Sequence, residues 1–228
     1  MEAKIESLIG TGLYSISEAS RLTHVNSSTL RRWLEGYSFT YKGEKHSTPP
    51  RWRRQVDGKG SALGFLDLIE ARVIGKFRKL GVRWRTLHAA GEAARQTFGA
   101  DHPFATLRLS TDGRDIFYDV ASEESDQAMI EVVHNQQVFT PFMRPLMIEV
   151  DFEKDLARRW WPMGKKRDVV LDPGRSFGKP IVDSSAIPTI VLARAAKAEG
   201  SVERVARWYD TTPEAVQDAI DFERKLAA

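Results

Sequence analysis

Apolar positions near the N-terminus have the spacing of a short helix. Three of them, at intervals of three residues, predict a helix over residues 17–22 with one face toward a core. Ser15 and Glu18 fit a capping box at its start, in which the Ser15 hydroxyl and the Glu18 carboxylate accept main-chain N–H groups. Residues 23–25 then form a tight turn. The apolar positions are Ile16, Ala19 and Leu22.

A second helix is expected directly afterwards, because Asn26 is a good N-cap for residues 27–35. Its inward set is Val25, Leu30, Trp33 and Leu34. Its outward set is Ser27, Ser28, Thr29, Arg31 and Arg32. Two short helices joined by such a turn describe a helix-turn-helix, whose second helix enters the DNA major groove with its N-terminal residues leading. The alternative is a structural helical hairpin with a solvated polar face.

The following segment alternates in the manner of strands. Residues 38–41 and 51–56 predict a β-hairpin, connected by a loop over 43–50, in the position of a wing. Its basic residues, interleaved with Tyr41 and Trp52, suit contact with DNA phosphates. A solvated charged hairpin is the alternative. The predicted DNA-contacting set is Ser27, Ser28, Thr29, Arg31, Arg32, Lys42, Lys45, Arg51, Arg53 and Arg54, opposed only by Glu35 and Glu44.

A pair of longer helices is predicted next, over residues 63–80 and 84–98, with Gly81 and Gly99 as their C-caps. The apolar stripe of the first is Leu66, Ile69, Val73, Phe77 and Leu80. The second is rich in small residues, which permit either a dimer interface or close packing within the chain. These are Ala89, Ala90, Gly91, Ala93 and Ala94.

The middle of the chain predicts a small mixed β region. Residues 105–109 and 116–120 flank Asp112-Gly113, a strong hairpin signal. An acidic loop is expected over 122–128. Further strands are expected at 146–152, 158–162 and 169–171.

Three short helices are predicted in the last forty residues, over 189–198 and then from Ser201 and from Thr212 as N-caps. Their expected core is Val191, Leu192, Val202, Val205, Ala206, Val216, Ala219 and Ile220. The third helix carries acidic residues that would repel phosphate, so a protein contact is favoured over a second DNA reader. The acidic residues are Glu214, Asp218, Asp221 and Glu223. Residues 172–180 fail the spacing of a phosphate-binding P-loop.

Charge is distributed unevenly over these segments. The net charge of +3 divides into +8 for residues 1–100 and −5 for residues 101–228, by count of Lys, Arg, Asp and Glu. A basic half indicates a polyanionic partner. The absence of cysteine excludes disulfides and thiolate metal sites. With neither a long apolar stretch nor a signal-peptide pattern, we expect a cytoplasmic protein that does not enter a membrane.

Catalytic chemistry is not expected. The histidines, at positions 24, 46, 88, 102 and 134, have no i, i+4 pairing that would place two ligands on one helix face. No nucleophile can be paired with a base, and the acidic stretch 123–126 lacks apolar surroundings that would raise a carboxyl pKa. The sequence therefore predicts a non-enzymatic protein without cofactor or metal.

Residues 14–33, with their aromatic start, capping box and Thr29-Leu30-Arg31, resemble the opening of MerR-type winged-helix regulators. The resemblance covers roughly residues 13–99. It departs from the family where Arg32-Trp33 replaces an aromatic followed by Glu, and the basic wing is longer than usual. In such regulators the two longer helices follow the wing and support it.

The C-terminal segment, about 168–226, resembles a small trihelical domain of bacterial toxin–antitoxin operons. The residues that carry the resemblance are Asp172–Val182, Ile187–Thr189, Ala198–Ser201, Val205–Tyr209, Pro213–Val216 and Ala219–Glu223. With the MerR-like start, the chain resembles an unusual VapB-type antitoxin. The resemblance implies a protein that binds its own operator DNA, as a homodimer or a larger assembly with toxin, and neutralises a PIN-like ribonuclease.

The fold class expected is mainly α with a β-rich middle (α+β). The expected domains are a winged helix-turn-helix (1–60), a supporting helical hairpin (61–100), a β-rich middle region (101–171) and a trihelical domain (172–228). In toxin neutralisation of this kind a basic side chain enters the acidic site of the ribonuclease. The candidates are Arg158, Arg159, Lys165, Lys166, Arg167, Arg224 and Lys225. The alternative function is a MerR-like regulator that responds to a small organic ligand.

Overall fold

The protein is described by a computed structural model that covers residues 10–50, 54–56, 62–134 and 136–227. It is a mixed α and β structure, mainly helical with small sheets, as predicted. Its contacts divide it into two compact units. The N-terminal unit consists of the described residues within 14–147 together with 154–157, and the C-terminal unit consists of residues 10–13, 148–153 and 158–227. No helix of the described residues is long and apolar enough to cross a membrane.

The N-terminal unit begins with the two predicted helices, α2 (Ile16–Thr23) and α3 (Ser27–Glu35). The capping box forms, because Ser15 N donates to Glu18 Oε2 at 2.9 Å and Glu18 N donates to Ser15 Oγ at 3.2 Å. His24 ends α2 in the left-handed conformation, with φ of 55°. Short strands β1 (Tyr14–Ser15) and β4 (Ala62–Leu63) pair antiparallel beside the helices.

The inward residues of both helices are buried as predicted, and they are Ile16, Ala19, Leu22, Val25, Leu30, Trp33 and Leu34. Trp33 stacks on Trp84 with ring centroids 5.2 Å apart. Gly75 lies against the turn between the helices, since a Cβ there would be 2.4 Å from Val25 Cγ2. The helix pair therefore rests closely on the helix that carries Gly75.

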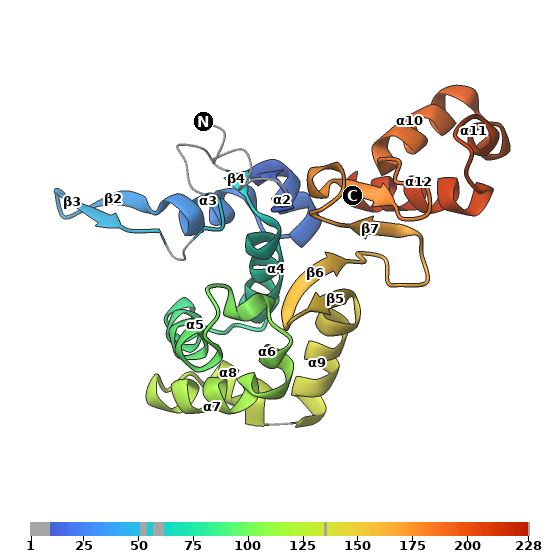
Figure 1. Cartoon of the computed structure of the whole chain (residues 1–228). Helices are drawn as coiled ribbons and strands as arrows, with labels where there is room; N and C mark the ends of the chain where they lie inside the picture. The colour runs from blue at the N-terminus through green and yellow to red at the C-terminus, as the bar shows by residue number, and fades with distance from the viewer. Residues whose placement is uncertain (1–9, 51–53, 57–61, 135, 228) are drawn as a thin grey trace. The chain divides into compact units, whose positions relative to one another are not determined.

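The predicted hairpin forms, but its second strand lies elsewhere than expected. Strands β2 (Tyr37–Tyr41) and β3 (Glu44–Thr48) pair antiparallel, so β3 lies in the segment expected to be a loop (Figure 1). Lys42 and Gly43 both have positive φ, 51° and 84°, which allows a two-residue turn whose twist matches that of the strands. The strand expected at 51–56 is not found at residues 54–56, and 51–53 lie outside the described residues.

The two longer helices occur where expected, as α4 (Phe65–Lys79) and α5 (Trp84–Phe98), and Gly99 is the C-cap of α5. Gly81 is not the C-cap of α4, which is Leu80, and the Leu80 side chain is exposed. Helix α4 is buried on nearly every side. Ala90, Gly91 and Ala94 of α5 pack within the chain, and a Cβ on Gly91 would lie 2.9 Å from Phe104 Cε2.

The strands expected between residues 105 and 120 are wrong, because this segment is helical. The turn η1 (Pro103–Ala105) leads into α6 (Arg108–Thr111) and α7 (Gly113–Glu123). Gly113 does not take the positive φ that a hairpin turn needs, and instead lies against Leu109 and Phe117. Buried Phe117, Val120 and Ala121 repeat with the helical period, which alternation over a five-residue window concealed.

Helices α8 (Gln127–His134) and α9 (Gln136–Ile148) complete the N-terminal unit. The expected loop at 122–128 is mostly the end of α7 and the start of α8. The strand expected at 146–152 is also displaced, since α9 continues to Ile148 and β5 (Val150–Glu153) follows.

The C-terminal unit contains a four-stranded sheet in the order β5-β6-β7-β8. Strands occur near 158–162 and at 169–171, as predicted: β6 (Leu156–Trp160) and β7 (Val169–Leu171) pair antiparallel. Strand β8 (Pro180–Val182) pairs with β7 after the turn η2 (Ser176–Gly178).

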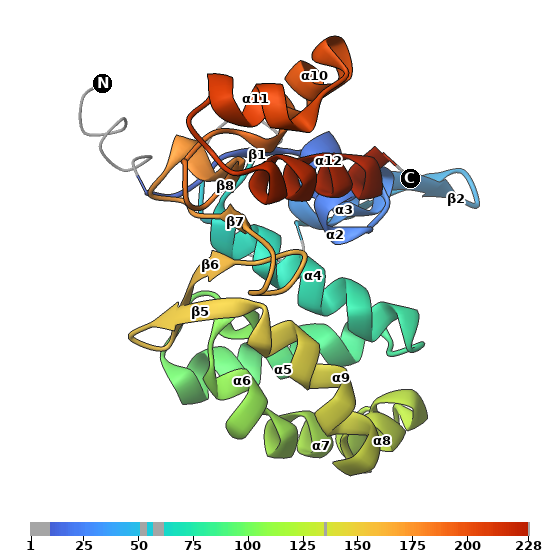
Figure 2. The same cartoon turned by 90° about the vertical axis from the view of Figure 1, so that its right-hand side faces the viewer.

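Three helices follow the sheet, and all occur where the sequence predicts them: α10 (Thr189–Glu199), α11 (Val202–Trp208) and α12 (Pro213–Ala227) (Figure 2). Their core joins the sheet through Val182, with Leu192, Val205, Ala206, Val216 and Ala219 also buried. Val202 and Ile220 are partly buried. The assignment of Val191 to this core is wrong, since the residue is 37% exposed and α10 packs through Leu192 and Ala196 instead.

Candidate nucleic-acid interface

The N-terminus of α3 presents the polar residues that the sequence singled out. Asn26 holds this end of the helix, because its Oδ1 accepts from Ser28 N at 2.9 Å and from Ser28 Oγ at 2.7 Å. Ser27 and Ser28 are exposed, whereas Thr29 is half-buried. Main-chain N–H groups at a helix start attract anions, so this end can receive a phosphate.

Arg31 and Arg32 are exposed because the opposite face of α3 is packed into the core. Leu30 and Leu34 are fully buried, and Trp33 is 8% exposed. Packing of that face fixes the rotation of α3, so both guanidinium groups lie on its solvent side. The arrangement can place two bidentate donors against a polyanion.

The hairpin that follows has two different faces. Tyr37, Phe39 and Tyr41 lie on one face with His46, which stacks on Phe39 at a centroid distance of 5.3 Å. Ser38, Thr40, Lys45 and Ser47 lie on the other face by register. The three large aromatic side chains are all exposed on one face, and such a contiguous patch indicates a contact surface.

Cations connect this aromatic face to α3 and to the hairpin tip. The Arg32 guanidinium lies 5.5 Å from the Tyr37 ring centroid, and Lys42 Nζ lies 5.6 Å from that of Tyr41. Of the ten predicted residues, seven lie on α3 and the hairpin: six are exposed and Thr29 is half-buried. These six are Ser27, Ser28, Arg31, Arg32, Lys42 and Lys45. Arg51 and Arg53 lie outside the described residues.

Arg54 is half-buried at the start of the segment that leads from the hairpin toward α4. Its neighbour Gln55 is tied to α4, because Gln55 N donates to Asp67 at 3.1 Å and Leu66 N donates to Gln55 Oε1 at 3.0 Å. The chain approaches closely here, since a Cβ on Gly64 would be 2.1 Å from Gln55 Oε1.

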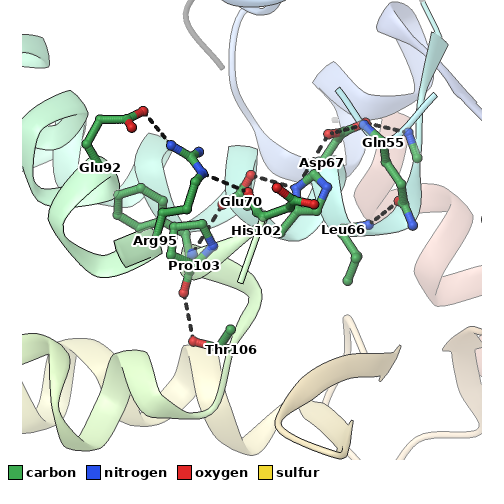
Figure 3. Close-up of polar contacts among 12 residues, drawn as sticks. Gln55, Leu66, Asp67, Glu70, Glu92, Arg95, His102, Pro103 and Thr106 are labelled. Carbon is green, nitrogen blue, oxygen red and sulfur yellow. Dashed lines mark hydrogen bonds and ion pairs between the residues drawn. The ribbon is translucent and has the colours of Figure 1, made fainter. Parts of the chain in front are cut away.

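A buried polar cluster supports this anchor (Figure 3). His102 Nδ1 lies 3.0 Å from Glu70 Oε2 and 3.8 Å from Asp67 Oδ1. Glu70 Oε1 also accepts from Phe104 N at 3.1 Å, and Asp67 Oδ2 accepts from Gly64 N at 2.8 Å. Sequence reasoning missed this cluster. Its signal was the pair of carboxylates at i, i+3 within an otherwise apolar helix.

Asp67, Glu70 and His102 are the group among the described residues that could hold a metal ion, since their ligand atoms lie within 4.8 Å of one another. Both carboxylates, however, already accept main-chain N–H bonds. Their geometry is therefore accounted for by the anchoring of Gln55, Gly64 and Phe104 to α4.

Burial shapes the titration of this cluster. Burial of Asp67 raises its pKa to about 6, against the lowering effect of its hydrogen bonds from Gly64 and Gln55. Burial opposes the charge of His102, but the hydrogen bond and the charge of Glu70 outweigh burial and raise the His102 pKa. Residues 123–126 were expected to lack surroundings that raise a carboxyl pKa, but Asp126 is buried, with 3% of its surface exposed. There hydrogen bonds from Thr86 and Arg83 outweigh burial and lower the pKa.

Most candidates for toxin contact are engaged within the C-terminal unit. Arg158 pairs with Asp172 at 3.1 Å, and Asp151 pairs with both Arg159 at 3.0 Å and Lys165 at 2.6 Å. Among the described residues, only Lys166 and Lys225 of the seven candidates are exposed without an ion pair.

Two acidic residues of α12, Asp218 and Asp221, are also engaged. Arg167 Nε lies 2.9 Å from Asp218 Oδ1, and its guanidinium also pairs with Asp221. Asp218 accepts from Asp168 N at 2.7 Å, and Asp221 pairs with Arg224 at 2.8 Å. The helix therefore uses its carboxylates to hold residues 167–168, a role that the sequence did not reveal.

Comparison with known proteins places these features in context. Residues 169–222 match a family described as a protein of unknown function (DUF433). The chain is 25% identical to "Putative antitoxin VapB45" of Mycobacterium tuberculosis (strain ATCC 25618 / H37Rv), over 96% of this chain and 97% of that protein. It is 22% identical to "Uncharacterized protein Rv2308" of the same strain, over 98% of this chain and 95% of that protein.

The crystal structure of Rv2018 from Mycobacterium tuberculosis has a similar fold, with a TM-score of 0.70 and 25% identity. The match covers 93% of this chain and 99% of that one. Similarity to the protein named "Putative antitoxin VapB45" thus extends along nearly the whole chain, and its C-terminal part, residues 169–222, is similar to DUF433.

Proposed function

We propose that this protein is the antitoxin of a type II toxin–antitoxin system, which represses its own operon and neutralises a PIN-like ribonuclease by direct binding. The observation that carries the proposal is the exposed pair Arg31 and Arg32 on α3, beside a hairpin that carries Lys42 and Lys45, in a chain similar to "Putative antitoxin VapB45" along nearly its full length. The proposed role is one of binding, without catalysis.

In this proposal α2, α3 and the β2–β3 hairpin form a MerR-like winged helix-turn-helix over residues 1–60, supported by α4 and α5. Helix α3 enters the major groove, where Arg31 and Arg32 contact bases or phosphates. Lys42 and Lys45 of the hairpin contact the backbone alongside. A homodimer places two copies of α3 on successive half-sites, one helical turn of DNA or a multiple of it apart.

Fluorescence anisotropy with the duplex that precedes the protein's own gene tests the DNA claim. An unrelated duplex of equal length gives the non-specific reference. We expect preference for the upstream duplex and an affinity that falls steeply with salt, because Lys and Arg displace counterions from phosphates. Equal affinity for both duplexes at physiological salt would contradict operator recognition.

The toxin is proposed to bind the C-terminal unit. Lys166 and Lys225 are the first residues to test there, because the other basic candidates are held by carboxylates of the chain itself. A free ammonium group suits the acidic metal site of a ribonuclease of this class.

Co-expression with the product of the adjacent reading frame, followed by pull-down on the tagged full chain, tests this claim. We expect a stable complex that suppresses ribonuclease activity. Lys166→Glu and Lys225→Glu should weaken the suppression, whereas Lys79→Glu, at the exposed end of α4, should not. If no neighbouring product binds the chain, the antitoxin assignment fails.

A further inference from the structure

The N-terminal unit contains an open cavity of about 660 Å³. Its wall is assembled from segments distant in sequence: Arg54 after the hairpin, the end of α5, the loop that carries His102, the start of α6 and the turn at Lys154. The turn is held in place by main-chain bonds, since Leu107 N donates to Asp155 O at 2.9 Å. A cavity of this volume has the size of a small-molecule site.

The charges on the cavity wall favour an anion. Basic side chains outnumber acidic ones, the basic ones being Arg54, His102, Arg108 and Lys154 and the acidic ones Asp101 and Asp155. Asp155 and Arg108 compensate each other, because Asp155 accepts from Arg108 N at 3.1 Å and lies 3.4 Å from Arg108 Nε, and this leaves Arg54, His102 and Lys154 against Asp101. Lys154 is exposed on the same wall.

His102 also lines this wall. The residue is 7% exposed, and its Nδ1 is held by Glu70, whose other oxygen accepts from Phe104 N. Nδ1 therefore carries a proton toward Glu70, and Nε2 on the opposite side of the ring has no partner among the described residues. Glu70 and Asp67 favour the charged ring, in which Nε2 is also a donor.

Apolar side chains complete the cavity. Leu66, Phe98 and Leu156 lie on the same wall as the charged groups. An inorganic ion would leave these apolar side chains without contact, whereas an organic acid would contact both the charged and the apolar side chains.

We propose that this cavity binds a small organic anion, a carboxylate or phosphate monoester, and that the bound anion lowers the affinity of the protein for DNA. The binding site stands on its own geometry; its regulatory effect rests on the proposed function. Arg54 connects anion binding to DNA binding, because it lines the cavity and is also a candidate phosphate contact. Its neighbour Gln55 is fixed to α4, so an anion that engages Arg54 removes a positive charge from the DNA side.

Thermal unfolding and titration calorimetry of the full chain, without DNA, test the binding. The probes are citrate, glycerol 3-phosphate and inorganic phosphate at constant ionic strength, with putrescine as a probe of opposite charge. An organic anion at ten times its Kd should raise Tm by about 3 °C or more. Putrescine should leave Tm unchanged. Citrate and glycerol 3-phosphate distinguish a carboxylate from a phosphate ligand.

Variants keep this test specific to the cavity. Ala100→Trp fills the cavity and Lys154→Met removes a cation from its wall, and both should weaken binding at least tenfold. Lys79→Met, exposed on α4 and outside the cavity, is the matched control. Absence of a shift with every anion, or an equal shift in Ala100→Trp, would overturn the proposal.

Anisotropy with the upstream duplex then tests the regulatory effect. A bound anion should reduce DNA affinity at least tenfold in the wild type and leave the Ala100→Trp protein unaffected. If the anion binds and DNA affinity is unchanged, regulation fails while the site stands. If the chain does not bind the duplex at all, the proposed function fails, and the unfolding experiment still decides the cavity.

Discussion

The helix pair α2–α3 and the helix pair α11–α12 have a similar local design. Each second helix begins at a polar cap, where Asn26 accepts from Ser28 N and Thr212 accepts from Ala215 N. Each pair buries small and branched residues at helical intervals. The outline of two short helices and a turn therefore does not separate a DNA reader from another module.

The use of charge separates them. On α3, Arg31 and Arg32 are exposed to solvent, and the Arg32 guanidinium contacts the ring of Tyr37 on the aromatic face of the hairpin. On α12, Asp218 and Asp221 form ion pairs with Arg167 of the same unit. Charges that the fold does not use are available to a partner, and charges that it does use contribute to stability. This difference predicts which substitutions change binding and which change folding.

Removal of the α3 cations should have the largest effect. Arg31→Ala with Arg32→Ala should weaken binding to the upstream duplex by about 2–6 kcal/mol, because each base or phosphate contact contributes about 1–3 kcal/mol. Fluorescence anisotropy at fixed salt measures this change. The matched control is Arg194→Ala with Lys197→Ala on α10, both exposed. Equal weakening in the two double variants would remove the distinction between the units.

The stability of the N-terminal unit should depend on pH through the buried cluster of Asp67, Glu70 and His102. The folded pKa of Asp67, about 6, lies above the ordinary 3.8, so the folded state retains a proton that the unfolded state has released between these values. Stability from this group therefore falls as pH rises from about 4 to 6, by up to about 3 kcal/mol. His102, whose pKa is also raised, changes stability in the same direction at higher pH.

Asp67→Asn removes the Asp67 contribution. Urea denaturation at several pH values should show that the stability difference, wild type minus variant, decreases across this window. Asp151→Asn, in the C-terminal unit, is the comparison: hydrogen bonds from Lys165 and Trp161 outweigh burial and lower the pKa of Asp151, so the corresponding difference should not decrease across this window. A wild-type minus Asp67→Asn difference that is constant with pH would show that Asp67 titrates normally.

Removing the contacts that Asp218 of α12 makes with Arg167 and Asp168 should reduce stability more than it reduces DNA binding. Asp218→Ala leaves Asp168 N without its acceptor and removes one partner of Arg167, which should cost about 1–3 kcal/mol of unfolding free energy. Urea denaturation measures the cost. Glu214→Ala, exposed on the same helix, is the control. A fall in operator affinity as large as that of the α3 variant would place DNA on α12 as well.

The smallest effect is expected at the helix caps. Ser15→Ala removes the hydroxyl that accepts from Glu18 N and should destabilise α2 by about 1 kcal/mol. Thr212→Ala should have a similar cost at α12, through its bond to Ala215 N. DNA affinity should decrease only in Ser15→Ala, because only α2 supports α3. A decrease of DNA affinity in both variants would indicate that α12, like α2, supports DNA binding by α3.

The sequence predicted the elements whose signals are local. Ser15, Asn26, Ser201 and Thr212 each cap a helix because the oxygen and its N–H donor are two or three residues apart. The exposed residues of α3 followed from the same local reasoning, since the helical period assigns its two faces.

Prediction failed where distant contacts decide the structure. Asp112-Gly113 is typical of a hairpin turn, but Phe117 and Val120 gain more by packing as a helix against the rest of the unit. The hairpin turn at Lys42-Gly43 carries no asparagine or aspartate, so the sequence predicts a loop where β3 lies. Likewise, no local pattern pairs His102 with Glu70 or Arg167 with Asp218.

The salt dependence of binding to the upstream duplex tests most directly whether DNA binds the N-terminal unit. The logarithm of the affinity should fall linearly with the logarithm of the salt concentration. Arg31→Ala with Arg32→Ala should reduce the slope by about 0.9 for each phosphate that the variant no longer neutralises. Arg194→Ala with Lys197→Ala should keep the wild-type slope. An unchanged slope in the α3 variant, or a reduced slope in the α10 variant, would contradict the assignment of DNA to the N-terminal unit.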